Sequence, residues 1–439
     1  MTTLSMGPKT WVLLNTDRVV NEIIGKRASI TNERPQFPIA GELVSRNNRF
    51  VLQKANVWKE PRYLMHQYIM GPSAKEHQHI IETASLELLK LYLNDPSTWY
   101  AHHYRYAITI MSKIVVNEVL PKSQPELDDL QKVTSTFLSS INSSFAEFFP
   151  QLNWLPESWQ TWRRHWKEMG DFHYDTIKTW WTDIRPRAEL SAKPSFVRDI
   201  VLEKFSGTEE QSMYLTMSVM AAGADNPRMA MNAWVMACIV SPSAMQRARQ
   251  ELDLVYGTDD LHLPSLDDLS KLPYMCAVVK EVLRWRPVVP LMPQRVLVED
   301  LEFEGYRFPA GTEFLVNSVP VCSHGYSRPG EFRPERWLGE DDEGEAGEKA
   351  TVKQDLWQFA FNAGRRSCVG YKLAQKILFV TFARLLYCFD FSLGDDQDVT
   401  KLNPFGLGEP FPVKVTVRSK AHAQLIIDEL AASEGVQKE

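Results

Sequence analysis

The chain has 439 residues, 44% of them hydrophobic and 24% charged, which is the composition of an ordinary globular protein with a large core. Its net charge of −6 excludes the basic surplus that nucleic-acid-binding proteins usually carry, so no nucleic-acid partner is expected. The cysteines form an odd, widely spaced set that predicts a reducing compartment rather than a disulfide framework: Cys238, Cys276, Cys322, Cys368 and Cys388.

The beginning of the chain carries neither a signal peptide nor a membrane-spanning segment. Its longest apolar run, Trp11 to Leu14, is far shorter than the ~20 residues that a spanning helix needs. The chain as written is therefore expected on the cytoplasmic side, without an anchor.

Helical patterns come first in chain order, over residues 64–93 and from about residue 100 to 119. Neighbouring histidines fall in these stretches, and we interpret them as solvated surface rather than zinc ligands: His77 with His79, and His102 with His103. Residues 145–181 then hold six of the 13 tryptophans. Tryptophans at helical spacing favour packing, and the alternative is an aromatic lid over an apolar substrate.

Residues 209–240 predict a buried central helix, because apolar side chains lie on nearly every side. The polar pair Asp225 and Asn226 interrupts it, followed by Pro227. Proline cannot donate to the Gly223 carbonyl four residues back, so we expect a kink that leaves this carbonyl free. Polar residues at a kink in a buried helix often serve function.

The last third of the chain adds a small strand component. Residues 296–319 show partial alternation with turn signals, which predicts strands. Residues 339–350 predict an exposed acidic surface loop, and residues 373–386 return to an apolar helix. The fold is therefore expected to be mostly α with small β-sheets.

The segment with the strongest chemical signal is FNAGRRSCVG, residues 361–370. Cys368 precedes a helix, where the helix dipole and the charges of Arg365 and Arg366 are expected to favour the thiolate that binds metals. The glycines allow the backbone to turn tightly beside a flat macrocycle. The pattern F-x-x-G-x-R-x-C-x-G resembles the heme-binding loop of the cytochromes P450 at every fixed position.

This resemblance implies a cytochrome P450 fold with a single large heme domain over residues 1–439. It implies heme b as cofactor, with Cys368 as the axial ligand of the iron and Phe361 beside it. The resemblance covers roughly residues 8–395, and two stretches look most like fungal secondary-metabolism members: FFPQLNWLP and LPYMCAVVKEVLRWRPVVP.

Three further segments resemble the family in order. Glu281 and Arg284 match its E-x-x-R helix, and Arg336 is expected to join them in a buried structural cluster. The motif Ala222–Asn226 matches the oxygen-activation segment of the central helix. The W-x-x-x-R element is also present, and the resemblance assigns contacts with the heme propionates to four residues: Trp58, Arg62, Arg295 and Arg366.

The sequence departs from the family at Asn226, where threonine is usual. Asp225 and Asn226 are therefore the expected catalytic pair, and we hypothesise that Asn226 and the Gly223 carbonyl position a water that relays protons with Asp225. The alternatives are a substrate hydroxyl in place of the threonine, or chemistry beyond simple hydroxylation. A second departure is the start, because only 57 residues precede Trp58, too few for the anchor by which a full-length relative is held at the endoplasmic reticulum. Membrane association stays open.

The expected activity is that of a heme-thiolate monooxygenase, which inserts one oxygen atom of O₂ into a small apolar organic substrate. The sequence has no nucleotide-binding signature, so an NADPH-dependent flavoprotein reductase is the expected partner, steered by basic residues such as Lys372 and Lys376. Two alternatives are a non-catalytic or decayed heme-binding protein, and a heme-thiolate isomerase that needs no reductase.

Overall fold

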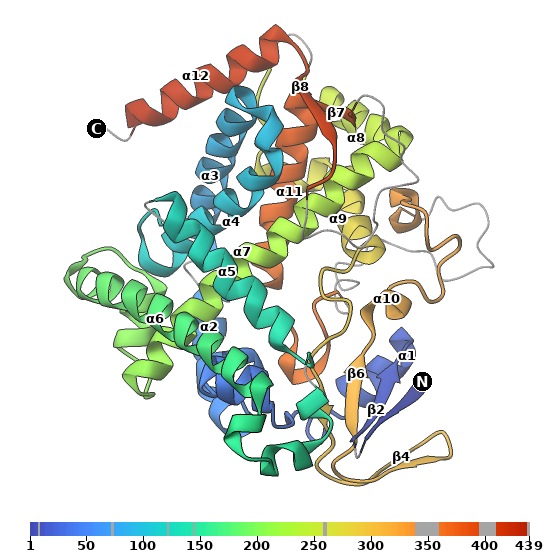
Figure 1. Ribbon diagram of the computed structural model, residues 1–439. Coiled ribbons are helices and arrows are strands. Elements are labelled where there is room, and N and C mark those ends of the chain that lie inside the picture. The colour runs from blue at the N-terminus through green and yellow to red at the C-terminus, as the bar shows by residue number, and fades with distance from the viewer. Residues whose placement is uncertain are drawn as a thin grey trace.

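The computed structural model describes residues 1–7, 9–71, 74–120, 123–143, 145–257, 261–338, 360–394 and 410–436, so the acidic loop expected at 339–350 lies outside the described residues. Helices dominate, which confirms the expected fold class (Figure 1). The helices are α1 (Asp17–Val20), α2 (Ala55–Met70), α3 (Ala74–Asn94), α4 (Trp99–Val116), α5 (Gln124–Ser140), α6 (Thr161–Leu190), α7 (Glu209–Val240), α8 (Pro242–Tyr256), α9 (Pro273–Trp285), α10 (Ser318–Val321), α11 (Tyr371–Cys388) and α12 (Lys420–Val436).

Strands form three small sheets in the described chain. A four-stranded sheet has the order β1-β2-β6-β3, in which β2 and β6 are parallel and the other pairs antiparallel. The pairs β4–β5 and β7–β8 are antiparallel hairpin-like sheets. The strands are β1 (Thr2–Met6), β2 (Lys9–Leu14), β3 (Arg295–Val296), β4 (Leu301–Phe303), β5 (Tyr306–Phe308), β6 (Glu313–Val316), β7 (Phe389–Leu393) and β8 (Val413–Val417).

Helix α7 runs through the centre of the molecule, with the four-stranded sheet beside the N-terminus at one side and α12 at the far end (Figure 1). Its first turn is fixed by a capping box between Thr208 and Gln211. It packs closely on α4, because a side chain at Gly223 would place its Cβ 2.4 Å from the Met111 sulfur. The helix continues through Pro227 to Val240, so the predicted helix is confirmed and the proline does not divide it.

Two expectations about the first helices were wrong. The single run predicted over 64–93 is two helices, since α2 ends at Met70 before Gly71 and α3 begins at Ala74. The histidines predicted at the surface include three that are buried: His77, His102 and His103. His103 bonds Tyr92 at 2.6 Å and Asn232 at 2.7 Å, which satisfies both of its ring nitrogens inside the core.

The tryptophan-rich segment divides into packed and exposed members. Trp180 and Trp181 on α6 are buried, and Trp162 and Trp166 pack against a small apolar cluster. By contrast, Trp154 is 84% exposed and Trp159 68% exposed. The packing interpretation therefore holds for the α6 residues and fails for the two before it. Among the described residues, no helix combines the length and apolar character needed to cross a bilayer.

Candidate active site

The cysteine loop is held in place by its own backbone. The Cys368 N–H donates to the Phe361 carbonyl at 2.8 Å, which closes the loop ahead of α11. Gly364 has a φ of +64°, and a Cβ there would lie 2.3 Å from the Ile24 carbonyl oxygen, so glycine is required at this position. Phe361 is half-buried, with its ring 6.2 Å from that of Tyr371.

Cys368 lies at an exposed position of the loop, yet the protein packed around its thiol removes enough solvent to raise its pKa. A backbone hydrogen bond from Gly370 and the charge of Arg62 act in the opposite direction, and they do not outweigh burial. Arg365 is exposed, and backbone carbonyls accept hydrogen bonds from the Arg366 guanidinium. That these two arginines favour the thiolate stays a prediction.

Buried arginines gather beside this loop, and we call Arg34, Arg295 and Arg366 the arginine cradle. Arg366 donates to the Asn32 and Gln53 carbonyls, each at 2.8 Å. Arg295 donates to the Asn362 side chain at 3.0 Å and to the Ala363 carbonyl at 3.2 Å, which ties it to the cysteine loop. Among the described residues, the groups that accept these hydrogen bonds are carbonyl and amide oxygens, and none is a carboxylate.

Arg34 is the member of the cradle that sequence reasoning missed. Its Nε donates to the Val51 carbonyl at 3.0 Å, and its Nη1 donates to the carbonyls of Pro293 and Gln294. The only signal in the sequence is an arginine followed by Pro35, which is too common to mark a site.

The three guanidiniums of the cradle destabilise one another. Burial lowers the pKa of Arg295 to about 9 and that of Arg366 to about 10, and Arg366 also acts against Arg295. Burial and both of these neighbours lower the pKa of Arg34. Glu33 acts in the opposite direction on Arg34 and Arg366, whereas no acid among the described residues acts on Arg295.

Two N–H groups of the cradle, Arg295 Nε and Arg366 Nη1, are buried without a hydrogen-bond partner. Because buried guanidiniums need counter-charges and acceptors, these groups fit a dianionic ligand such as the two propionates of a heme. Trp58 lies beside the arginine cradle, because the Arg366 guanidinium stacks 4.5 Å from its ring. Arg62 lies 6.0 Å from that ring and interacts with the charge of Cys368. The residues present therefore fit the group that the sequence implies.

The predicted catalytic pair on α7 points in two directions. Asp225 is buried and paired with Arg228, whose Nε and Nη2 donate to it at 3.0 and 2.6 Å. Arg228 also donates to the Tyr100 hydroxyl at 2.8 Å. Asn226 is exposed, and its amide donates to the Ala222 carbonyl at 3.1 Å. The i,i+3 spacing of Asp225 and Arg228 was the signal that would have predicted this pair.

Ala222 and Asn226 are the exposed positions in the middle of a helix that is otherwise mostly buried. They are four residues apart and therefore lie on one face of α7. A small residue and a polar amide on this accessible face leave room for a ligand beside the helix.

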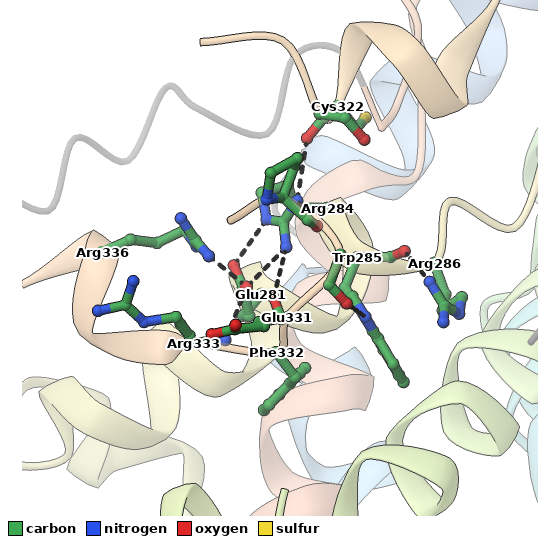
Figure 2. Close-up of polar contacts among 12 residues, drawn as sticks. Glu281, Arg284, Trp285, Arg286, Cys322, Glu331, Phe332, Arg333 and Arg336 are labelled. Atoms are coloured by element: carbon green, nitrogen blue, oxygen red, sulfur yellow. Dashed lines mark hydrogen bonds and ion pairs between the residues drawn. The ribbon is translucent and has the colours of Figure 1, made fainter. Parts of the chain in front are cut away.

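The cluster predicted from the E-x-x-R segment is confirmed, and Figure 2 shows its members converging on one carboxylate. Glu281 on α9 accepts from Arg284 at 2.8 and 2.9 Å and from Arg336 at 3.0 Å. The Trp337 indole N–H and the Arg333 backbone N–H also donate to it, each at 2.9 Å. Glu281 is completely buried, so this pairing satisfies a charge that would otherwise be costly.

A pocket of about 760 Å³ lies next to this cluster, where the ends of α7 and α9 meet α8. It is lined by polar residues such as Arg247, Arg286 and Glu335, and by none of the residues predicted to bind the cofactor. In the described chain, no cluster of three histidine, cysteine, aspartate or glutamate residues could hold a metal ion. The cysteine loop and the arginine cradle therefore remain the candidate active site.

A cysteine loop facing a cationic cradle, inside a mostly helical fold, defines a protein of the heme-thiolate class. A family model described as Cytochrome P450 matches residues 1–415. The chain therefore belongs to the cytochrome P450 family.

Relatives and solved structures agree with this assignment. The chain is 28% identical to a cytochrome P450 monooxygenase of Armillaria gallica, over 95% of this chain and 83% of the relative. It is 27% identical to one of Aspergillus aculeatus, over 98% of this chain and 84% of the relative. The fold matches a zebrafish cytochrome P450 solved with abiraterone, with a TM-score of 0.74 and 20% identity over 95% of this chain and 96% of that one. These findings confirm a P450 monooxygenase, an oxidoreductase that incorporates oxygen from O₂, rather than either alternative.

Proposed function

We propose that this monooxygenase holds heme b between Cys368 and the arginine cradle and oxidises a small, largely apolar substrate of fungal secondary metabolism. The observation that carries the cofactor assignment is the pair of buried, unpartnered N–H groups on Arg295 and Arg366 beside the cysteine loop. Relatives from Armillaria and Aspergillus, all named monooxygenases, support the choice of substrate class.

When bound, the heme supplies the iron at which O₂ is reduced. Cys368 would give that iron its thiolate ligand, and the Gly370 hydrogen bond to the sulfur would tune its electron donation. Arg34, Arg295 and Arg366 would neutralise the propionates, with Trp58 stacked against Arg366.

We assign to Asn226 the positioning of a water that relays protons with Asp225, rather than a direct proton transfer from Asp225. Asp225 accepts two hydrogen bonds from Arg228, so it must break this pair before it can carry a proton to the site. Asn226 uses its Nδ2 on the Ala222 carbonyl, which leaves its Oδ1 to hold a water. Pro227 gives the Gly223 carbonyl no helical donor, so this oxygen is the second group that fixes the water.

The water relay has a specific test. Asn226→Ala should lower the fraction of consumed reductant that appears as product, because the water loses one of its two anchors. If Asn226→Thr improves this coupling while Asn226→Ala changes nothing, the relay does not run through the amide. The CO difference spectrum of both variants serves as the folding control.

Electrons are proposed to come from a separate NADPH-dependent flavoprotein reductase. Arg365 and Lys372 are exposed beside the cysteine loop, Lys376 is half-buried and Arg366 is buried. The exposed pair is placed to attract an acidic partner. Reversing both charges should slow reduction of the heme and weaken its dependence on ionic strength, with substrate binding unchanged. An unaltered reduction rate would place the docking face elsewhere.

The experiment that tests the cofactor assignment is the reduced CO difference spectrum of the purified chain. A thiolate-ligated heme gives a long-wavelength Soret band. Cys368→Ser should remove this band, whereas the matched control Cys276→Ser, a half-buried cysteine on α9, should keep it. A shorter-wavelength band in the unmodified protein, or a band that survives in Cys368→Ser, would rule out Cys368 as the ligand.

A further inference from the structure

The loop that leads into α2 contains another buried arginine, away from the arginine cradle and the Glu281 cluster. Arg49 is 3% exposed, and its guanidinium stacks 4.5 Å from the Phe137 ring of α5. Its Nε and Nη2 are buried and have no hydrogen-bond partner. These two atoms lie on the same edge of the planar guanidinium, so their N–H bonds point in the same direction.

Two other polar atoms without partners lie near Arg49. The hydroxyl of Tyr214 on α7 and the Nδ1 of His173 on α6 are both buried and unpartnered. The short turn Phe50–Leu52 directly after Arg49 packs on α7, and α6 packs on α7, which brings the three side chains into one region. Burial raises the pKa of Tyr214 and lowers that of His173, and the charge of Arg49 contributes a smaller lowering of each pKa. Within the described chain, Tyr214 is the one neighbour that acts on Arg49, and no carboxylate balances its charge.

The hydrogen bonds of His173 fix its tautomer. The Thr136 hydroxyl donates to the Lys132 carbonyl at 2.5 Å, so at its 2.7 Å contact with His173 it must accept from Nε2–H. Burial then keeps His173 neutral, with its pKa lowered to about 3. His173 therefore brings no charge that would compete with Arg49 for an anion.

Arg49 is not required to fasten its loop. Arg46 pairs with Asp171 of α6 at 3.2 Å and stacks 3.6 Å from the Tyr174 ring. Asn48 donates to Glu210 of α7 at 3.1 Å. These contacts already hold the loop on α6 and α7. Apart from its stack on Phe137, Arg49 is a buried charge without a counter-charge among the described residues, which is costly unless a ligand supplies one.

The same loop borders the cofactor site. The Val51 carbonyl accepts from Arg34 and the Gln53 carbonyl accepts from Arg366, so the chain passes from Arg49 to the arginine cradle within four residues. Tyr214 also lies on the helix that exposes Ala222 and Asn226, which follow it by about 12 Å and about 18 Å at 1.5 Å per residue. A substrate whose carboxylate is bound at Arg49 would thus extend along α7 toward the cofactor site.

We propose that Arg49 binds a carboxylate of the substrate, with Nε and Nη2 donating side by side to its two oxygens and the Tyr214 hydroxyl donating to one of them. The proposal deepens the proposed monooxygenase function and rests on it, because it narrows the substrate class to organic acids with an apolar body. A planar, bidentate pair of donors selects carboxylate over an ester or an alcohol, neither of which offers two charged oxygens. Arg49 is thus a specificity-determining residue that lies remote from the cysteine loop.

The test is a spectral titration of the heme-loaded enzyme with matched probes. Octanoate, decanoate and dodecanoate are compared with their methyl esters, and binding is followed by the Soret shift. We expect the best carboxylate to bind at least about 10-fold more tightly than its ester, as for a charge-assisted bidentate pair. Arg49→Met should abolish this difference and leave the CO difference spectrum unchanged. Arg46→Met, which removes an exposed arginine of the same loop, should keep it.

The remaining outcomes overturn the proposal. Equal binding of acid and ester, or a preference for the acid that survives in Arg49→Met, would mean that ordered water satisfies Arg49. Failure of all three acids to bind would have the same consequence. Thermal unfolding without any probe gives a second reading, because Arg49→Met should be at least as stable as the unmodified enzyme, whereas a structural role for Arg49 predicts a clear loss.

A different result would contradict the proposed function itself, namely the absence of the long-wavelength CO band in the unmodified protein. The thermal comparison of Arg49→Met with Arg46→Met can still be read in that case.

Discussion

Two buried arginine clusters of the described chain differ in whether a buried carboxylate lies at their centre. Around Glu281, which is completely buried, two arginines, one indole N–H and one backbone N–H converge on a single carboxylate. In the arginine cradle, Glu33 acts on Arg34 and Arg366, and two buried N–H groups, on Arg295 and Arg366, have no hydrogen-bond partner among the described residues. A buried carboxylate that accepts from several donors of the chain serves stability, whereas buried cations without such a carboxylate indicate where a ligand would supply the negative charge.

The largest change in stability is expected at the Glu281 cluster. Glu281→Gln leaves Arg284 and Arg336 buried without their counter-charge, which should cost about 3–5 kcal/mol of unfolding free energy. Denaturant unfolding of the heme-loaded protein measures this loss. Glu331→Gln, which removes an exposed carboxylate close by, is the control and should change stability little. Similar losses in the two variants would contradict the distinction between the clusters.

A buried carboxylate gives an intermediate effect and extends the comparison to an acid. Glu147 is 2% exposed, and burial raises its pKa to about 7, partly offset by Lys9 and by backbone N–H groups of Ile39, Ala40 and Asn142. The folded state therefore holds this proton more tightly than the unfolded state, and stability falls as pH rises from about 4.5 to 7.

Glu147→Gln should remove that slope and be more stable than the unmodified protein at pH 8, by roughly 2–3 kcal/mol. Unfolding measured across this pH range checks the prediction. Glu87→Gln, an exposed position on α3, should keep the original slope. The same pH dependence of stability in both variants would show that the Glu147 carboxyl does not cause the slope.

The smallest change in stability is expected within the cradle. Arg295→Met removes one of three mutually repelling cations, so the heme-free protein should gain about 1 kcal/mol. The same change should speed heme release by about 10-fold or more, since a propionate loses its donor. Transfer of heme to apomyoglobin and thermal unfolding measure the two effects, with the exposed Arg307→Met as control. Unchanged heme release together with lower stability would make the cradle a structural cluster.

Continuous local patterns made parts of this fold predictable. The apolar run of α7 and that of α11 each fix a helix within a single segment, and both were predicted. The Glu281 cluster was predicted through its family motif, and only the structure shows the Trp337 and Arg333 donors. The burial of His103 depends on Tyr92 and Asn232 and could not be inferred from the histidine pair alone.

The candidate site was less predictable, because its contacts join distant parts of the chain. Arg34 bonds a carbonyl 260 residues away, so no local pattern marks its role. Arg49 is similar, since its environment is assembled from α5, α6 and α7. Asp225 is the opposite case, because its partner Arg228 is only three residues away and the pair could have been predicted from the sequence.

The parallel pairing of β2 with β6 has a consequence for biosynthesis. The Trp11 indole donates to Glu313 across 302 residues, and the two strands pair from Trp11 to Leu14. At 5–20 residues per second, a ribosome needs roughly 15–60 s to deliver the second strand after the first. Throughout this interval the hairpin of β1 and β2 presents an open edge of unpaired N–H and C=O groups. The β1–β2 pair is thus exposed to mispairing until β6 is made.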